Sequence, residues 1–78
     1  NLFTIYPNPT NNKILIHSKN MSGKEVNISN SVGLNILKLN EIPLDGIPVS
    51  EFNSGIYFIS IIDKLTKKTT TYNFIKTQ

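Results

Sequence analysis

The stretch Ile56-Tyr57-Phe58-Ile59-Ser60-Ile61-Ile62 is the most apolar run of the chain and decides its fold class. Seven residues are too few for a buried helix, and four of them are isoleucines, whose branched side chains suit the pleated surface of a sheet. Turn-forming residues bound the run, with Asn53-Ser54-Gly55 before it and residues 63–66 after it. The run therefore predicts the central strand of a sheet over residues 56–62.

The composition of the whole chain favours the same fold class. Alanine is absent and methionine occurs once, so strong helix formers are scarce. The hydrophobic fraction of 38% is enough for a globular core, and 78 residues form one domain, residues 1–78. Because the chain begins with Asn1 instead of Met, we expect a piece of a longer protein or a processed form. No cysteine is available for disulfides or thiolate zinc sites, and no apolar run is long enough to span a membrane.

Alternating apolar residues predict the remaining strands. Ile14 and Ile16 share one face of the segment 13–17, and Val26 and Ile28 share one face of the segment 24–29. Further strands are expected at 2–6, 34–39, 47–49 and 67–76, with 47–49 at a sheet edge because Pro48 lacks an N–H. About seven short strands at this spacing predict an Ig-like antiparallel β-sandwich. The predicted core residues are Val26, Ile28, Tyr57, Ile59 and Ile61.

Several short segments predict turns. Pro7 and Pro9 end the first strand, and Pro9 keeps Asn8 out of the helical region. Asn30-Ser31-Val32-Gly33 has the residue preferences of a four-residue turn. Gly33 and Gly55 are interpreted as turn glycines at positive φ. Tyr57 is expected to pack in the core, with its hydroxyl bonded to the backbone.

The positive charge is concentrated in the last fifteen residues. The segment 64–78 holds Lys64, Lys67, Lys68 and Lys76 and no acidic residue. One interpretation is a set of solvated lysines on an edge hairpin, which resist edge-to-edge pairing; the other is a basic docking face. Lys76 in particular is expected to be solvated and to contribute little to the fold. Nucleic acid is not expected as a partner, because the chain has no arginine and no interleaved aromatic and lysine residues.

The polar residues predict neither an enzyme nor a bound cofactor. His17 is the single histidine and falls on the polar face of its predicted strand. The five acidic residues are scattered, and no serine has the glycines of a nucleophile elbow around it. Asp45, Gly46 and Glu51 could contact calcium, but the spacing is unlike that of an EF-hand. We therefore expect no catalytic residue, no metal and no cofactor.

Four motifs occur in a fixed order along the chain: Tyr6-Pro7-Asn8-Pro9, Val26-x-Ile28-x-Asn30-x-x-Gly33, Gly55-x-Tyr57-Phe58-x-x-Ile61 and Phe74-Ile75-Lys76. Together they resemble the C-terminal sorting domain of proteins exported by the bacterial type IX secretion system. The resemblance implies an Ig-like sandwich at the C-terminal end of a larger secreted protein. It implies that the domain takes the attached cargo across the outer membrane of a Gram-negative cell. It implies recognition through Gly55, Tyr57, Phe74, Ile75 and Lys76. Structural turns would be formed by Tyr6, Pro7, Asn8, Pro9, Asn30 and Gly33.

The resemblance also implies partners and a location. The partners are the type IX machinery in the outer membrane and a sortase-like cysteine protease, which would cut near or before Asn1. The cargo would pass through the periplasm and be anchored to surface lipopolysaccharide or released, and the domain itself would be monomeric. The alternative is an Ig-like accessory module that binds glycans or proteins. Glycan binding usually needs an exposed aromatic platform, whereas the chain has no tryptophan and Tyr57, Tyr72 and the four phenylalanines are expected in the core.

Overall fold

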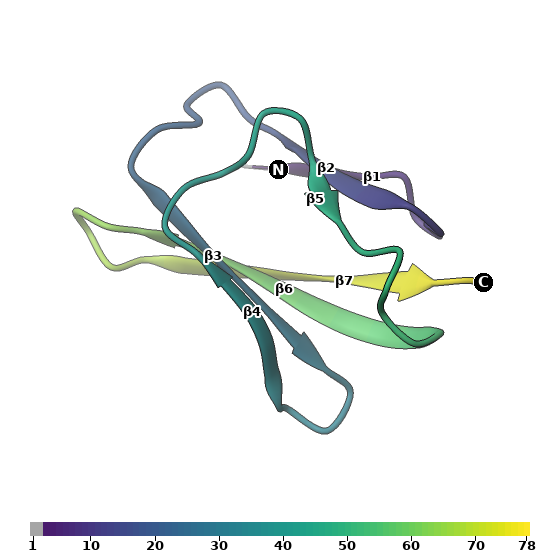
Figure 1. Ribbon diagram of the computed structural model, residues 1–78. Helices are drawn as coiled ribbons and strands as arrows, with labels where there is room; N and C mark the ends of the chain where they lie inside the picture. The colour runs from purple at the N-terminus through teal and green to yellow at the C-terminus, as the bar shows by residue number, and fades with distance from the viewer. Residues whose placement is uncertain (1–2) are drawn as a thin grey trace.

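The computed structural model describes residues 3–78 as two packed antiparallel sheets (Figure 1). The three-stranded sheet has the order β1-β2-β5 and the four-stranded sheet the order β4-β3-β6-β7. These residues contain no helix, so none is present that could cross a membrane. The expected all-β, Ig-like sandwich is confirmed. The strands are β1 (Thr4–Tyr6), β2 (Lys13–His17), β3 (Lys24–Asn30), β4 (Asn35–Leu39), β5 (Ile47–Pro48), β6 (Gly55–Asp63) and β7 (Thr69–Lys76).

Strand β6 lies inside the larger sheet, between β3 and β7, as the apolar run predicts. Its partners run along its whole length, from Tyr57 beside Asn30 to Asp63 beside Lys24 on the β3 side. Tyr57, Ile59 and Ile61 point inward and are buried, because alternate residues of a strand face opposite sides. A strand that is paired on both sides and buried on one face is expected inside a sheet that packs against the core on one face and meets solvent on the other.

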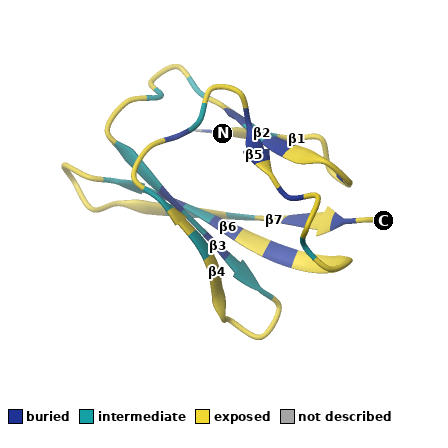
Figure 2. Ribbon diagram, in the orientation of Figure 1, coloured by how far each residue is buried: buried dark blue, intermediate teal, exposed yellow. Residues whose placement is uncertain are grey.

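The core fills the space between the two sheets, where the buried segments of both layers face each other (Figure 2). All five predicted core residues are at most 7% exposed, which confirms the interpretation of the alternating patterns. The smaller sheet contributes Ile14, Ile16 and Ile47 to the same cluster. One continuous cluster therefore joins both sheets, formed by Phe3, Ile14, Ile16, Val26, Ile28, Ile42, Ile47, Val49, Tyr57, Ile59, Ile61 and Phe74.

The strand ends differ from the sequence-based expectation by one or two residues. Strand β7 begins at Thr69 instead of residue 67, because Lys67 adopts a φ of 65° and belongs to the β6–β7 turn. The turn is closed by the Asp63 amide, which donates to the Lys68 carbonyl at 2.9 Å. Strand β5 has only two residues and lies at a sheet edge, as Pro48 predicts. The expected start of the first strand at Leu2 lies outside the described residues.

Phe58 lies at a different position from the one that the sequence analysis predicted. Phe58 is 38% exposed and lies on the outer face of the larger sheet, so the expectation that all four phenylalanines fill the core was wrong. The alternation that buries Tyr57 and Ile59 turns the residue between them to the opposite face. The outer face of this sheet therefore carries an aromatic side chain that the core does not use.

Candidate functional site at the end of the last strand

The four sequence motifs meet at one end of the larger sheet. Across the β6–β7 pair, Gly55 lies opposite Lys76, and Tyr57 lies opposite Phe74. On the other side of β6, Tyr57 is the partner of Asn30, where the β3–β4 turn begins. Segments far apart in the sequence thus form one neighbourhood around the end of β7, near the C-terminus of the chain (Figure 1).

Tyr57 is the aromatic centre of this neighbourhood. Its ring centroid lies 5.1 Å from that of Phe52 and 5.5 Å from that of Phe74, stacked on the latter at 18°. Its hydroxyl donates a hydrogen bond of 2.6 Å to the Asn53 carbonyl. The expected core position and backbone hydrogen bond of Tyr57 are both confirmed. Tyr57 therefore holds the segment before β6 onto the sheet, and its buried ring is not available to a partner.

Two turns depend on residues that the sequence singled out. Gly33 has a φ of 89° and its amide donates to the Asn30 carbonyl at 3.0 Å, which closes the β3–β4 turn. The Asn30 carboxamide oxygen accepts hydrogen bonds from the amides of Val32 and Leu34, at 3.1 and 2.9 Å. Gly55 begins β6 at a φ of 150°, and a Cβ built there would meet no atom within 4 Å. A side chain at residue 55 is thus opposed by backbone strain alone.

Asn8, at the centre of the Pro7-Asn8-Pro9 motif, caps the outer edge of β7. Its side-chain oxygen accepts a hydrogen bond from the Ile75 amide at 2.9 Å, and its side-chain nitrogen donates to the Asn73 carbonyl at 3.4 Å. The side chain of Asn8 thereby imitates the backbone of a neighbouring strand. Tyr6, Pro7 and Pro9, the other residues of the motif, are exposed, and both proline peptide bonds are cis.

Thr10 continues this cover along β7, a role that no sequence pattern predicted. Its amide donates to the Ile75 carbonyl at 2.9 Å, and its carbonyl accepts from the Thr77 amide at 2.8 Å. The buried hydroxyl donates to the Lys13 carbonyl at 2.7 Å, which fixes the loop before β2. Residues 8–10 therefore form what we call the N-terminal cover, which pairs with the end of the last strand.

The three residues of the closing motif have different environments. Phe74 is fully buried against Tyr57, whereas Ile75 is 45% exposed. Lys76 is only 5% exposed, and its ammonium group donates to the Thr77 carbonyl at 2.8 Å. The expectation that Lys76 is solvated was therefore wrong. Alternation turns Lys76 to the same side as Phe74, and Thr10 pairs beside it.

An exposed apolar surface lies over the same end of the sheet. Ile56 and Ile75 are cross-strand neighbours, 51% and 45% exposed, and Phe58 follows Ile56 on the same face of β6. We call Ile56, Phe58 and Ile75 the outer apolar patch. Its position on an antiparallel pair lets the three side chains contact one another and a partner at the same time.

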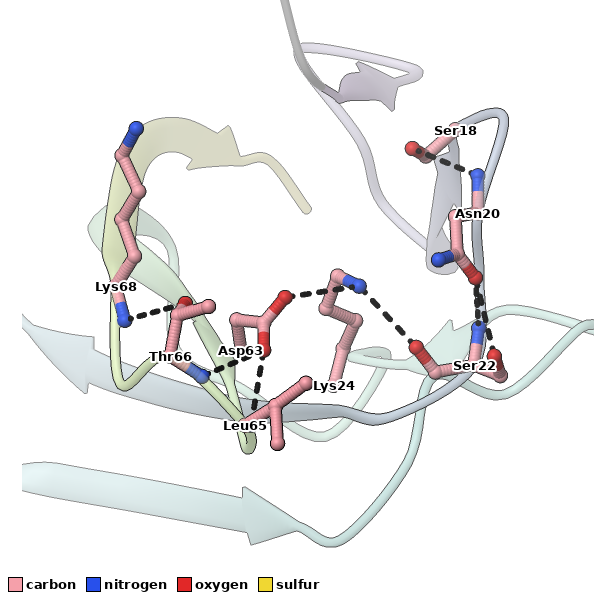
Figure 3. A network of polar contacts seen from close by, with 8 residues as sticks. All are labelled: Ser18, Asn20, Ser22, Lys24, Asp63, Leu65, Thr66 and Lys68. Carbon is pink, nitrogen blue, oxygen red and sulfur yellow. Dashed lines mark hydrogen bonds and ion pairs between the residues drawn. The ribbon is translucent and has the colours of Figure 1, made fainter.

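The other end of β7 is polar and positively charged (Figure 3). The Asp63 carboxylate accepts hydrogen bonds from the amides of Leu65 and Thr66, at 2.9 and 3.0 Å, and pairs with the Lys24 ammonium at 3.4 Å. The two backbone hydrogen bonds, Thr66 first, and then Lys24 lower the pKa of Asp63. Of the four lysines in residues 64–78, Lys64, Lys67 and Lys68 are exposed. The four lysines of residues 64–78 form no common face, because Lys76 is buried at the opposite end of β7.

The structure brings together no catalytic arrangement in the part of the chain that it describes. His17 ends β2 and is exposed. Asp45 and Glu51 are exposed, and residues 3–78 hold no group of three histidine or acidic side chains placed to bind a metal ion. What this end of the sheet presents to solvent is the outer apolar patch and part of the backbone edge of β7.

The chain is similar to known proteins in sequence and in fold. The family described as "Secretion system C-terminal sorting domain" matches residues 4–76, which is nearly the whole chain. A solved structure of PorZ, an essential bacterial surface component of the type IX secretion system of Porphyromonas gingivalis, is similar in fold, with a TM-score of 0.76 and 18% sequence identity. The similarity covers 97% of this chain and 11% of the PorZ chain. A search of curated protein sequences found no match. From the match over residues 4–76, this chain belongs to the C-terminal sorting domain family of the type IX secretion system.

Proposed function

We propose that this domain is the signal that directs an attached cargo protein across the outer membrane through the type IX secretion system. The observation that carries the proposal is the family match over residues 4–76. The domain acts by being bound and transforms no substrate, in keeping with a family of sorting signals. The attached cargo reaches the cell surface or the medium.

The surface that the secretion machinery contacts is the outer apolar patch together with the backbone edge of β7. Ile56, Phe58 and Ile75 are exposed apolar side chains at the end of the sheet where the family motifs meet. Desolvating such side chains favours association by about 25 cal/mol for each Å² removed from water. Tyr57, Phe74 and Lys76 are buried, so they support this surface from below and are not contacted directly.

Removal of the domain after export is the second part of the proposal. A sortase-like cysteine protease cuts the chain near or before Asn1, and the released cargo is anchored at the cell surface or liberated. The cutting position lies outside the described residues. A compact sandwich on the C-terminal side of the cut supports this order, because a protease cleaves exposed chain more readily than paired strands.

An export assay tests the proposal. A fluorescent protein fused before Asn1 is expressed in a cell with the type IX system, and fluorescence is measured at the surface and in the medium. We expect export of the intact fusion and retention when Phe74 to Gln78 are deleted. Normal export of this deletion would refute the proposed function.

Folding and recognition need separate variants, because the deletion also removes the buried Phe74. Lys76→Ala does not separate them, since Lys76 is buried too. The double variant Ile56→Ala and Ile75→Ala removes half-exposed side chains and keeps Phe74. Ile36→Ala on β4, where the isoleucine is 41% exposed, is the matched control. We expect the double variant to remain folded and be retained, and the control to be exported; export of a folded double variant would exclude the outer apolar patch.

A further inference from the structure

The residues that the structure describes cover only half of the outer edge of β7. In an antiparallel pair, the N–H and C=O groups of one residue point to the same side. The amide of Ile75 and the carbonyls of Asn73 and Ile75 point to the outer edge, where the N-terminal cover binds them. By the same alternation, the backbone groups of Thr69 and Thr71 and the amide of Asn73 point to that edge too.

This second half of the edge is open. Within residues 3–78, no strand pairs with β7 on its outer side, and the bridge to Thr10 is at Lys76. Thr69, Thr71 and Asn73 are exposed. A surface cavity of about 570 Å³ lies alongside, and its lining residues are Phe3, Thr4, Ile5, Asn8, Phe58, Thr71, Tyr72 and Asn73. We call the segment Thr69–Asn73 the open half-edge of β7.

The other strand edges of the described residues are less suited to pairing. Strand β5 has two residues, one of them Pro48, which lacks an N–H. Strand β1 has three residues. Strand β4 is longer, but its pairing with β3 shifts register between Ile28 and Ser29, and such a bulge twists an edge away from regular pairing. The open half-edge of β7 is the longest regular edge that remains.

The charge beside the open half-edge is predominantly positive. Around the β6–β7 turn lie five of the eight lysines, Lys19, Lys24, Lys64, Lys67 and Lys68. The two acidic residues of this region are Asp63, which is paired with Lys24, and Glu25, which lies next to Ile62. The region therefore carries a net charge of +3, which equals the net charge of the whole chain. Lys68 immediately precedes the open half-edge, so a strand bound there meets positive charge at one end.

We propose that the open half-edge of β7 binds an extended acidic segment of a partner protein by β-strand addition. The backbone groups of Thr69, Thr71 and Asn73 provide hydrogen bonds, and Lys67 and Lys68 attract the acidic side chains. A protein segment is favoured over phosphate-rich ligands because the chain has no arginine for bidentate phosphate contacts. The inference rests on the proposed function and deepens it by naming the chemistry of the partner and the part of the edge that it occupies.

A peptide titration tests the proposal with the 78-residue chain. The probe is a capped peptide of about six residues alternating valine and glutamate, long enough to pair with the open half-edge. The matched probes carry lysine in place of glutamate, or N-methyl groups on alternate residues, which remove the backbone donors. We expect amide NMR shifts at Thr69, Thr71 and Asn73 with the acidic peptide, weaker at high salt, and none with the N-methylated peptide.

Variants locate the binding on the protein. Thr71→Pro removes an amide that faces the open edge, and we expect it to weaken binding by about tenfold or more. Thr71→Val is its control, because it also loses the 3.0 Å hydrogen bond to the Ser60 hydroxyl but keeps the amide. Lys67→Glu with Lys68→Glu should also abolish binding, whereas Lys38→Glu on β4 should not. If Thr71→Pro does not fold, the N-methylated peptide still decides.

Three results would overturn the proposal: no binding of the acidic peptide, equal binding of the N-methylated peptide, or shifts confined to Asn35–Leu39 of β4. An export assay separates this inference from the proposed function. If the intact fusion is exported and a folded Thr71→Pro fusion is exported equally well, the open half-edge is not used and the sorting function stands. If the intact fusion is not exported, the sorting function itself fails, whatever the peptide result.

Discussion

Asn8 and Ile75 are 67 positions apart in the sequence, yet the Asn8 carboxamide accepts a hydrogen bond from the Ile75 amide near the end of β7. Asn8 is an exposed asparagine between two prolines. These residue types predict a loop and nothing more specific. Its function follows from position, since an unpaired backbone edge invites pairing with another chain. The short polar side chain of Asn8 thus makes hydrogen bonds that a neighbouring strand would otherwise make at this point.

Replacing Asn8 should loosen the end of β7. Asn8→Ala removes two hydrogen bonds, at 2.9 and 3.4 Å, and we expect a loss of about 0.5–1.5 kcal/mol of unfolding free energy. Hydrogen exchange of the Ile75 amide should become faster, because its acceptor is gone. Asn11→Ala, in the same exposed loop, is the control. Unchanged exchange at Ile75 would show that the Asn8 cap is not formed in solution.

Gly55 sets the start of β6 through its backbone conformation. Gly55→Val places a branched side chain at a φ of 150°, and we expect a loss of about 1–3 kcal/mol. No atom lies near the new Cβ, so the loss measures strain and not a clash. Chemical denaturation gives the value, with Ile56→Val as a neighbouring control. An unchanged midpoint would mean that residue 55 has a different φ.

Asp63 makes the β6–β7 turn sensitive to acid. Its pKa is lowered in the folded chain by hydrogen bonds from Thr66 and Leu65, so its contribution is present above the ordinary value of 3.8 and is lost as pH falls through the lower folded value. We expect Asp63→Asn to lose less stability than the parent chain between about pH 5 and about pH 2. Asp45→Asn is the control. Equal acid sensitivity of the Asp63→Asn and parent chains would contradict the assignment.

At the scale of elements, strand β7 has two roles, packing against the core and presenting an exposed surface, because its residues alternate between its two faces. Phe74 faces inward and belongs to the core, and Lys76 is buried on the same side of the strand. Ile75 and Asn73 face outward, where the outer apolar patch lies. The N-terminal cover closes the end of its edge, and Thr69–Asn73 remain open. One strand therefore supplies structural support and a contact surface without conflict, because neighbouring residues face opposite sides.

Because β7 has these two roles, we expect substitutions at its neighbouring residues Phe74 and Ile75 to lower the unfolding free energy by different amounts. Phe74→Ala removes a fully buried ring and should cost about 3–5 kcal/mol, a large part of the stability of a small domain. Ile75→Ala should cost less than about 1.5 kcal/mol, because its side chain is already half exposed. Thermal melting of both variants measures the difference. Similar losses would mean that β7 is rotated relative to the observed register.

At the scale of the whole molecule, a single buried cluster reaches from Ile14 and Ile47 in the smaller sheet to Ile59 and Phe74 in the larger one. The N-terminal cover ties the beginning of the chain to its last strand. Neither sheet can therefore lose its packing partner and remain stable. A sandwich of this kind presents its outer faces and open edges on a rigid support.

We accordingly expect a single cooperative unfolding transition. Far-ultraviolet circular dichroism and tyrosine fluorescence should give the same midpoint, because Tyr57 lies in the cluster shared by both sheets. A fluorescence change that precedes the loss of strand signal would show that the smaller sheet, with the N-terminal cover, opens on its own.

Much of the fold was predictable because its causes are local. The run Ile56–Ile62, the alternation around Val26 and Ile28 and the turn Asn30–Gly33 all express preferences of neighbouring residues for strand or turn. Those preferences determined the strand order along the chain, the central place of β6 and the five predicted core residues. The four motifs likewise pointed to the family that the comparison over residues 4–76 identified.

Only the tertiary structure decided which strand edges are covered and which lysines are free. Asn8 and Thr10 reach β7 across the whole length of the chain, and no local pattern encodes that contact. For the same reason Lys76 looked solvated in the sequence but is buried, whereas Phe58 looked like a core residue but is exposed. Alternation divides the residues of a strand into two sets that face opposite sides of the sheet. Packing between the two sheets decides which set is buried in the core and which is exposed to water.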